Sequence, residues 1–505
     1  MAKTRTVYST QDDGAGTLRD ALRITASYTP EWRDADALEN GDIIDFSDEL
    51  EEGGVITILL SSSLALPNGK DVIVDGGATW TDNGELKTRV ILDAQGTKDE
   101  PTYRCLNISY AQNYTLSGLT FKNGTSLSST DGGGVYATSN DATKTQTFNY
   151  CVFKNCYSSR YGGGLSCVNS SNRILNYCFF DTCEGIGGGA SFASNTGDAI
   201  QLNNCTFKTC NGASTGGAYI YNGGNVIFNT CTFTNCTTTS TASTVSSTIS
   251  ITQTSFLTLN NCVIASTSTQ YSVIINSATA TVIISGNTSI DKLKTFTNAS
   301  ITTSAFTVSG ALTVDDLNLA DNTTVTFSGV DAVLAVTSSA TIGTTTFAAS
   351  EGATGYAAFP ANTDISAATF TGVKNCTYGA GIESASLSKT TVTWTATNLS
   401  TDILIEQQNG DSWTTLTTTG TGGSYSGTFG EGTTVRLFDG VAFWYASTQF
   451  PYWVVNSFAV TNNDWIVTPY AISTNGGGGT DPVTGDPLPS WTVNTADITP
   501  NFKGL

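Results

Sequence analysis

The sequence predicts an all-β chain: a right-handed parallel β-helix with an N-terminal helical cap, followed by a small antiparallel β-sandwich. Three observations predict this fold. A Cys-x-Phe-x-x-Cys box occurs four times at a nearly constant period, short alternating apolar and polar runs surround the boxes, and a glycine-rich turn with a short helical pattern opens the chain. A fixed period of about 20 to 50 residues is typical of a solenoid, in which each repeat stacks on the one before.

The four boxes give the length of one coil. They begin at Cys151, Cys178, Cys205 and Cys231, so the step is 27, 27 and 26 residues. A coil of this length with short strands is the unit of a parallel β-helix, whose strands add at ~4.8 Å per rung. Equivalent residues then form columns, and we expect the first cysteines of the boxes to form one. A second, inward column is expected from Phe121, Phe153, Phe180, Phe207 and Phe233.

The opening residues predict a cap. A glycine turn precedes Leu18, Ala21 and Leu22, which lie at helical spacing. The end of a β-helix exposes unpaired strand groups, so it needs a cap against end-to-end association, and this helix would supply it. Asp12 and Asp13 are expected to cap the first turn rather than to bind a ligand. We therefore assign residues 1–50 to the cap and first rungs, and residues 51–378 to the β-helix.

Beyond residue 378 the pattern changes. Strand-like runs at roughly ten-residue spacing, joined by Asn409-Gly410 and by glycine-rich turns, predict an antiparallel sandwich over residues 379–448. An aromatic β segment covers 449–475, and a linker with a C-terminal tail covers 476–505. Such a tail is either a docking element or a frayed terminus. As a docking element it would use Trp491, Phe502 and Leu505.

Two of these motifs carry a resemblance. The opening S-x-x-D-x-G-x-G-T-L-R-x-A pattern of residues 9–21 resembles the N-terminal element of bacterial surface β-helix proteins. The Phe-x-x-Cys boxes and glycine clusters resemble the FxxN and GGA repeats of polymorphic outer-membrane, adhesin-like proteins, with Cys where that family mostly has Asn. The resemblance implies an extracellular, mostly non-enzymatic β-helix used as a stalk or adhesin. Residues 379–448 also resemble a fibronectin type III module.

Composition narrows the class of partner. The chain has 42 acidic and 22 basic residues and a net charge of −20, which argues against nucleic acid or an anionic membrane as partner. No apolar run approaches the ~20 residues of a membrane-spanning helix, so we expect no membrane insertion. No signal peptide is visible at the start, which suits a virion protein. No cofactor is expected, although carboxylates of this surface suit Ca²⁺.

The absence of histidine limits the chemistry. With no histidine in the chain, Ser-His-Asp and Cys-His catalysis are excluded, and so are most zinc hydrolase centres. Carboxylate chemistry stays open, because glycosidases need only two acids about 5–10 Å apart. If the chain were such an enzyme or a lyase, the acids would be Asp181 and Glu184. A base would come from Lys154, Arg173 or Lys208 on neighbouring rungs.

The 12 cysteines allow three interpretations. They pack as small hydrophobic residues, they form disulfides within a box or between rungs, or they bind metal. The C-x4-C spacing spreads thiols along columns rather than gathering them at one point.

These observations favour a non-enzymatic structural or adhesive protein, either a virion fibre or decoration or a cell-surface stalk or adhesin. The location would be extracellular. Its partners would be neighbouring protomers or other surface or virion proteins, with glycans as further candidates. The alternative is a polysaccharide-degrading β-helix, a glycosidase or lyase like those of phage tailspikes.

Overall fold

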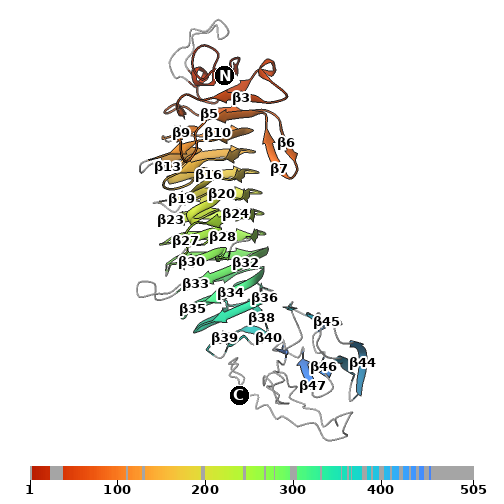
Figure 1. Cartoon of the computed structure of the whole chain (residues 1–505). Coiled ribbons are helices and arrows are strands. Elements are labelled where there is room, and N and C mark those ends of the chain that lie inside the picture. The colour runs from red at the N-terminus through yellow and green to blue at the C-terminus, as the bar shows by residue number, and fades with distance from the viewer. Residues whose placement is uncertain are drawn as a thin grey trace. The chain divides into compact units, whose positions relative to one another are not determined.

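The computed structural model confirms an all-β chain built on a parallel β-helix (Figure 1). The described residues are 3–22, 38–109, 112–127, 131–194, 199–242, 246–266, 269–277, 279–295, 304–329, 332–353, 355–360, 363–365, 367–377, 384–387, 391–396, 403–409, 412–419, 425–430, 434–438, 443–447 and 454–455. The chain forms two compact units, Met1–Val282 and Ile283–Leu505. The division falls inside the range predicted as β-helix, and each unit is described by itself.

The first unit opens with the predicted helix. Strand β1 (Thr4–Val7) pairs in parallel with β2 (Asp42–Phe46), and helix α1 (Leu18–Ala21) lies between them in sequence. Thr17 is the N-cap, since its side chain accepts a hydrogen bond from the backbone N–H of Asp20. Leu18 and Ala21 are buried, so the helix presents its apolar face to the protein.

The two aspartates before this helix, Asp12 and Asp13, make different contacts. Asp13 Oδ1 accepts a hydrogen bond from Gly14 N at 2.9 Å, which is a local turn contact. Asp12 reaches further: its carboxylate accepts from Arg19 Nη2 at 2.8 Å and from Ser61 N at 3.0 Å. Burial alone would raise the pKa of Asp12, but these hydrogen bonds lower it. Asp12 therefore joins the cap to the segment after β3 (Ile56–Leu59).

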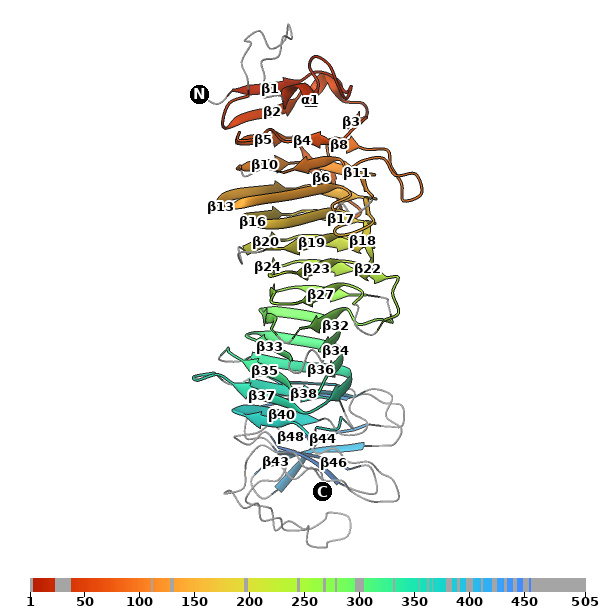
Figure 2. The same ribbon diagram turned by 90° about the vertical axis from the view of Figure 1, so that its left-hand side faces the viewer.

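Successive rungs of this unit contribute strands to four parallel ladders (Figures 1 and 2). The first ladder is β5 (Val72–Asp75), β10 (Tyr114–Ser117), β13 (Val135–Asn149), β16 (Leu165–Asn176), β20 (Ala199–Asn203), β24 (Asn225–Asn229) and β28 (Phe256–Asn260). The second is β3, β8 (Val90–Asp93), β11 (Leu119–Lys122), β14 (Val152–Lys154), β17 (Phe179–Asp181), β21 (Thr206–Lys208), β25 (Thr232–Thr234) and β29 (Val263–Ala265).

The other two ladders complete each rung. The third is β4 (Leu64–Ala65), β9 (Leu106–Ile108), the first parts of β13 and β16, β19 (Ala190–Ala193), β23 (Ala218–Tyr221), β27 (Ile249–Thr252) and β30 (Val273–Asn276). The fourth is β12 (Thr125–Ser126), β15 (Tyr157–Ser158), β18 (Glu184–Gly187), β22 (Asn211–Thr215) and β26 (Thr237–Thr238).

The Cys-x-Phe-x-x-Cys box is a three-residue strand between two left-handed corners. Around β14, the corners are Tyr150 and Asn155, with φ of 52° and 53°. The same corners recur in the next rung at Tyr177 and Thr182, with φ of 54° at both. Left-handed φ is uncommon outside glycine and asparagine, so the box fixes two sharp bends per rung. The boxes have the same length because each strand must fit between these two bends.

The phenylalanines of the boxes lie in register and form a column in the core. Phe121, Phe153, Phe180, Phe207 and Phe233 pair in turn along the second ladder and are each 0% exposed. Their ring centroids are 5.3, 4.6, 4.4 and 4.6 Å apart. The glycine cluster beside them is required by close approach, because a Cβ on Gly164 would lie 2.6 Å from the carbonyl oxygen of Gly189.

The cysteines of the boxes are buried thiols in the described residues. Each thiol donates to backbone carbonyls, as Cys178 Sγ does to Phe148 O at 3.5 Å and Cys205 Sγ to Leu175 O at 3.4 Å. Burial raises the pKa of the nearby Cys167 thiol to about 11. Such thiols behave as small apolar residues, which is the first of the three interpretations.

An asparagine ladder runs along the outside, one residue before each corner. Its members are Asn149, Asn176, Asn203, Asn229 and Asn260, which pair in register along the first ladder. Each of the last four donates its side-chain amide to Oδ1 of the asparagine in the preceding rung, at 2.9, 2.8, 2.8 and 3.3 Å, whereas Asn149 donates to Ser117 Oγ at 3.5 Å. The asparagine before each box is therefore a hydrogen-bonding contact between rungs.

The second unit also begins as a parallel stack. One ladder is β33 (Ser304–Val308), β35 (Thr323–Phe327), β37 (Thr345–Ala349) and β39 (Thr369–Thr371). The other is β32 (Asn287–Thr295), β34 (Ala311–Leu319), β36 (Ala332–Ile342), β38 (Gly355–Phe359) and β40 (Val373–Thr377). Phe347 and Phe370 stack at 4.8 Å, so aromatic stacking between rungs recurs here.

Two antiparallel sheets follow in the range expected to hold the sandwich. One is β41 (Ser384–Leu387), β42 (Thr391–Ala396) and β45 (Tyr425–Gly430). The other is β44 (Ser412–Thr419), β43 (Ile403–Asn409), β46 (Thr434–Phe438), β47 (Phe443–Ser447) and β48 (Val454–Val455). Strands β43 and β44 pair at Asn409↔Ser412, where the sequence predicts a turn. The docking-tail candidates Trp491, Phe502 and Leu505 lie outside the described residues.

Candidate functional site

The acids and bases singled out in the sequence lie mostly in one column on the outer side of the second ladder. Asp93, Lys122, Lys154, Asp181 and Lys208 occupy one register position on five successive rungs, and we call them the charged column. Lys122 Nζ lies 2.9 Å from Asp93 Oδ2, and Lys154 Nζ lies 3.0 Å from Asp181 Oδ2. Opposite charges on adjacent strands stabilise a sheet, so each of these two ion pairs joins its own two rungs, whereas Lys122 and Lys154 lie opposite each other between the pairs.

Asp181 is engaged on both of its carboxylate oxygens. Besides the contact with Lys154, its Oδ1 accepts a hydrogen bond from Thr182 Oγ1 at 2.9 Å. The residue is only 7% exposed. A carboxylate in this setting is held by the scaffold rather than presented to a substrate.

Lys208 is engaged by a hairpin arm, formed by β6 (Thr79–Asp82) and β7 (Glu85–Thr88). The arm stands beside the stack in Figure 1. At its tip, Glu85 accepts hydrogen bonds from Lys208 Nζ at 2.6 Å and from Lys87 Nζ at 2.8 Å. These bonds lower the pKa of Glu85 to about 2 and raise the pKa of Lys208. Lys208 therefore stays protonated at neutral pH and is unsuited to act as a base.

Glu184 forms a separate ion pair, with Lys98. The hydrogen bond from Lys98 to Glu184 raises the pKa of Lys98, and its ammonium lies 5.5 Å from the centroid of the Tyr157 ring. Asp181, Glu184 and Lys208 are thus each bound to a different partner: Lys154, Lys98 and Glu85. The structure gives no acid–base pair among them.

Arg173, a candidate base, lies in the core. It is 0% exposed and occupies a first-ladder column between Gln146 and Ile200. Its Nε donates to Gln146 Oε1 at 2.8 Å, and its Nη2 donates to Val168 O at 3.0 Å. A base must reach its substrate, and the buried position of Arg173 does not allow this. Hydrogen bonds to Gln146 and to backbone carbonyls satisfy its guanidinium.

Two negative observations concern the described residues alone. No three of their Cys, Asp and Glu side chains gather closely enough to hold a metal ion. Their helical segments include none with the length and apolar character needed to cross a membrane.

A second cluster of functional groups lies on the outer face of the third ladder. Tyr161 stacks on Tyr221 at 4.4 Å and on Tyr219 at 5.8 Å, with interplanar angles of 24° and 8°. Arg160 places its guanidinium carbon 4.9 Å from the centroid of the Tyr161 ring. We call these four residues the tyrosine cluster. Tyr161 and Tyr219 are half-buried, whereas Tyr221 is 7% exposed.

Charged groups adjoin the tyrosine cluster. Asp131 Oδ1 lies 3.7 Å from Arg160 Nε. Burial raises the pKa of Asp131, while the positive charges of Arg160 and Arg104 oppose that rise. The guanidinium of Arg104 lies 5.0 Å from the centroid of the Tyr136 ring, and burial lowers its pKa. Arg160 and Asp131 therefore lie beside the stacked rings, and Arg104 is close enough for its charge to act on Asp131.

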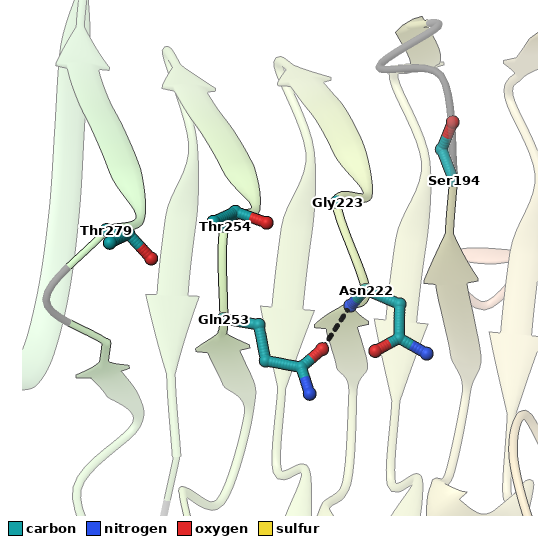
Figure 3. Close-up of a pocket in the computed structure, with 6 residues that line it drawn as sticks. All are labelled: Ser194, Asn222, Gly223, Gln253, Thr254 and Thr279. Carbon is teal, nitrogen blue, oxygen red and sulfur yellow. Dashed lines mark hydrogen bonds between the residues drawn. The ribbon is translucent and has the colours of Figure 1, made fainter. Parts of the chain in front are cut away.

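A shallow polar groove lies on the surface of the first unit. It has a volume of about 550 Å³ and crosses several rungs (Figure 3). Its lining is Ser194, Asn222, Gly223, Gln253, Thr254 and Thr279. Asn222 N donates to Gln253 Oε1 at 2.8 Å, so part of the lining is already paired. The groove has no charged or aromatic side chain.

Comparisons with known proteins add little to this geometry. No protein-family model matches the chain, and no curated protein matches it in sequence. Among solved structures, it is similar to the gp42 tailspike of Acinetobacter phage vb_AbaP_AS12, with 10% identity, a TM-score of 0.27, and coverage of 77% of this chain and 73% of that chain. A likeness of this size does not establish a shared function.

The sequence pattern did not indicate the tyrosine cluster or the hairpin arm. Tyr161, Tyr219 and Tyr221 come from segments between boxes, where no repeated motif marks them. A signal did exist for two of them, since Tyr219 and Tyr221 sit two residues apart around the buried Ile220 and so share the outer face. The arm could have been found from Asn83-Gly84, a strong hairpin turn signal.

Proposed function

We propose that this chain is a non-enzymatic structural or adhesive surface protein, extracellular, and carried on a virion or a cell surface. The observation that supports the proposal best is the charged column. Its lysines and aspartates form ion pairs between rungs, and Lys208 is bound by the hairpin arm. The groups that would perform acid–base chemistry are thus used to hold the stack together.

The regular contacts between rungs support the same proposal. The rings of the phenylalanine column stack in every rung from Phe121 to Phe233, and the asparagine ladder repeats outside it. A solenoid of this kind is a stiff support on which binding surfaces are displayed. Its partners would be neighbouring protomers or other surface or virion proteins, with glycans as further candidates.

Fractionation tests the location. Native material is separated into purified particles or cell envelopes and cleared medium, and peptides of this chain are quantified by mass spectrometry in each. Recovery at a fixed stoichiometry in particles or envelopes is the expected result. Recovery only as free protein in the medium would contradict an assembled role.

A product assay tests the absence of catalysis. The purified chain is incubated with acidic and neutral polysaccharides, and reducing ends and unsaturated products are measured. We expect no turnover above a heat-denatured control. Turnover abolished by Asp181→Asn would overturn the proposal and establish the polysaccharide-degrading alternative.

A further inference from the structure

We propose that the tyrosine cluster is a carbohydrate-binding site for sugars that carry a carboxylate, such as uronic acids. This inference rests on the proposed adhesive function and names a ligand for it. Two observations support it: stacked rings on an outward sheet face, and charged groups that include a guanidinium beside them.

The rings lie on the outward face of the third ladder. Tyr219 pairs in register with Ser191, and Ser191 with Ser166, while their sequence neighbours Ala218, Ala190 and Leu165 are buried in the core. Side chains alternate between the two faces of a strand, so Tyr219, Ser191 and Ser166 point away from the core. The C–H face of a pyranose packs on aromatic rings, and tyrosine adds a hydroxyl for hydrogen bonding.

Two small side chains, Ser166 and Ser191, share the register column of Tyr219 and are each 0% exposed. They are closed to solvent, so a ligand at this face would contact the rings and the charged groups rather than these hydroxyls.

The charges favour an acidic sugar. The chain as a whole has a net charge of −20, yet Arg104 and Arg160 here adjoin a single carboxylate, Asp131. Guanidinium groups bind carboxylates through paired hydrogen bonds. The side chain of Arg160 is 47% exposed and can reach a ligand, whereas that of Asp131 is 11% exposed and would accept hydrogen bonds from sugar hydroxyls.

The test measures binding of the full-length chain to a short oligogalacturonate by isothermal titration calorimetry, with a malto-oligosaccharide of equal length as the neutral probe. The variants are Tyr161→Ala, Tyr161→Phe and Arg160→Gln. The matched control is Tyr150→Ala, because Tyr150 stacks on Tyr177 at 4.9 Å and is 41% exposed, but belongs to a different corner. Melting curves of all variants report folding.

We expect the oligogalacturonate to bind and the neutral sugar to bind more weakly. Tyr161→Ala and Arg160→Gln should each weaken the binding by about tenfold or more, whereas Tyr161→Phe and Tyr150→Ala should retain it. No binding by the native chain, or an equal loss in Tyr150→Ala, would overturn the site. The acidic-sugar assignment would be overturned if the neutral sugar bound as tightly as the oligogalacturonate and if Arg160→Gln left that binding unchanged. Because particle recovery is measured separately, either failure leaves the proposed surface location standing.

Discussion

Truncation of Phe180 tests the packing of the first unit. Phe180 is 0% exposed, with rings stacked on both sides: Phe153 at 4.6 Å and Phe207 at 4.4 Å. Removal of a buried phenylalanine side chain typically costs about 3–5 kcal/mol of unfolding free energy. Loss of two aromatic contacts, each contributing ~0.5–1.5 kcal/mol beyond burial, places Phe180→Ala toward the upper end of that range.

Denaturant unfolding measures the loss, and native-state hydrogen exchange locates it. Because each rung contacts its neighbours, protection should fall first in β14, β17 and β21. Phe180→Leu should recover most of the stability, since it refills much of the volume. Phe256→Ala is the control: Phe256 is 45% exposed, so its truncation should cost under about 1 kcal/mol. An unchanged denaturation midpoint for Phe180→Ala would refute the idea that this column supports the stack.

Three further outcomes are expected. Asn176→Ala removes the side-chain hydrogen bonds to Asn149 and Asn203 and should lower the unfolding free energy by about 1–2 kcal/mol in denaturant titrations. No change in that free energy would mean that hydrogen bonds to water replace those of the ladder without cost. The pKa of Glu85 is lowered from 4.5 to about 2, so its contribution is complete above pH 4.5 and is lost as the pH falls through about 2. Hydrogen-exchange protection in β7 should therefore decline as the pH falls from 4.5 to about 2. In Glu85→Gln, the protection should not change over the same pH range. The cysteines described as buried should resist a thiol reagent in the native protein and react after denaturation, whereas rapid native labelling would show that the columns open.

The repeating parts of this structure could be predicted from the sequence, because residues that lie one period apart occupy equivalent positions in successive coils. A period of 27 residues places Phe153, Phe180 and Phe207 at equivalent points of successive coils, and the helix at Leu18 follows from the spacing of its apolar residues. The cap was not predicted correctly, because the N-cap is Thr17 and not Asp12 or Asp13. The left-handed corners at Tyr150 and Tyr177 were harder to foresee, because tyrosine rarely adopts this conformation.

The candidate site was less accessible to prediction because its residues do not repeat. Arg173 was named as a candidate base, yet it shares a core column with Gln146 and Tyr114, and Gln146 accepts hydrogen bonds from both. Glu85 lies 123 residues before its partner Lys208, so no local pattern joins them. Tyr161 meets Tyr219 and Tyr221 only through the stacking of coils.

The in-register pairing of the boxes has a consequence for how such a chain can change in length. Phe153 pairs with Phe180, and Phe180 pairs with Phe207, through the same strand positions. Deletion of residues 178–204 would join Tyr177 to Cys205 and set Phe153 opposite Phe207 with the corner and the strand intact. The core column would thus survive the loss of one coil, whereas the charged column would change, because Lys154 would lie opposite Lys208 in place of Asp181.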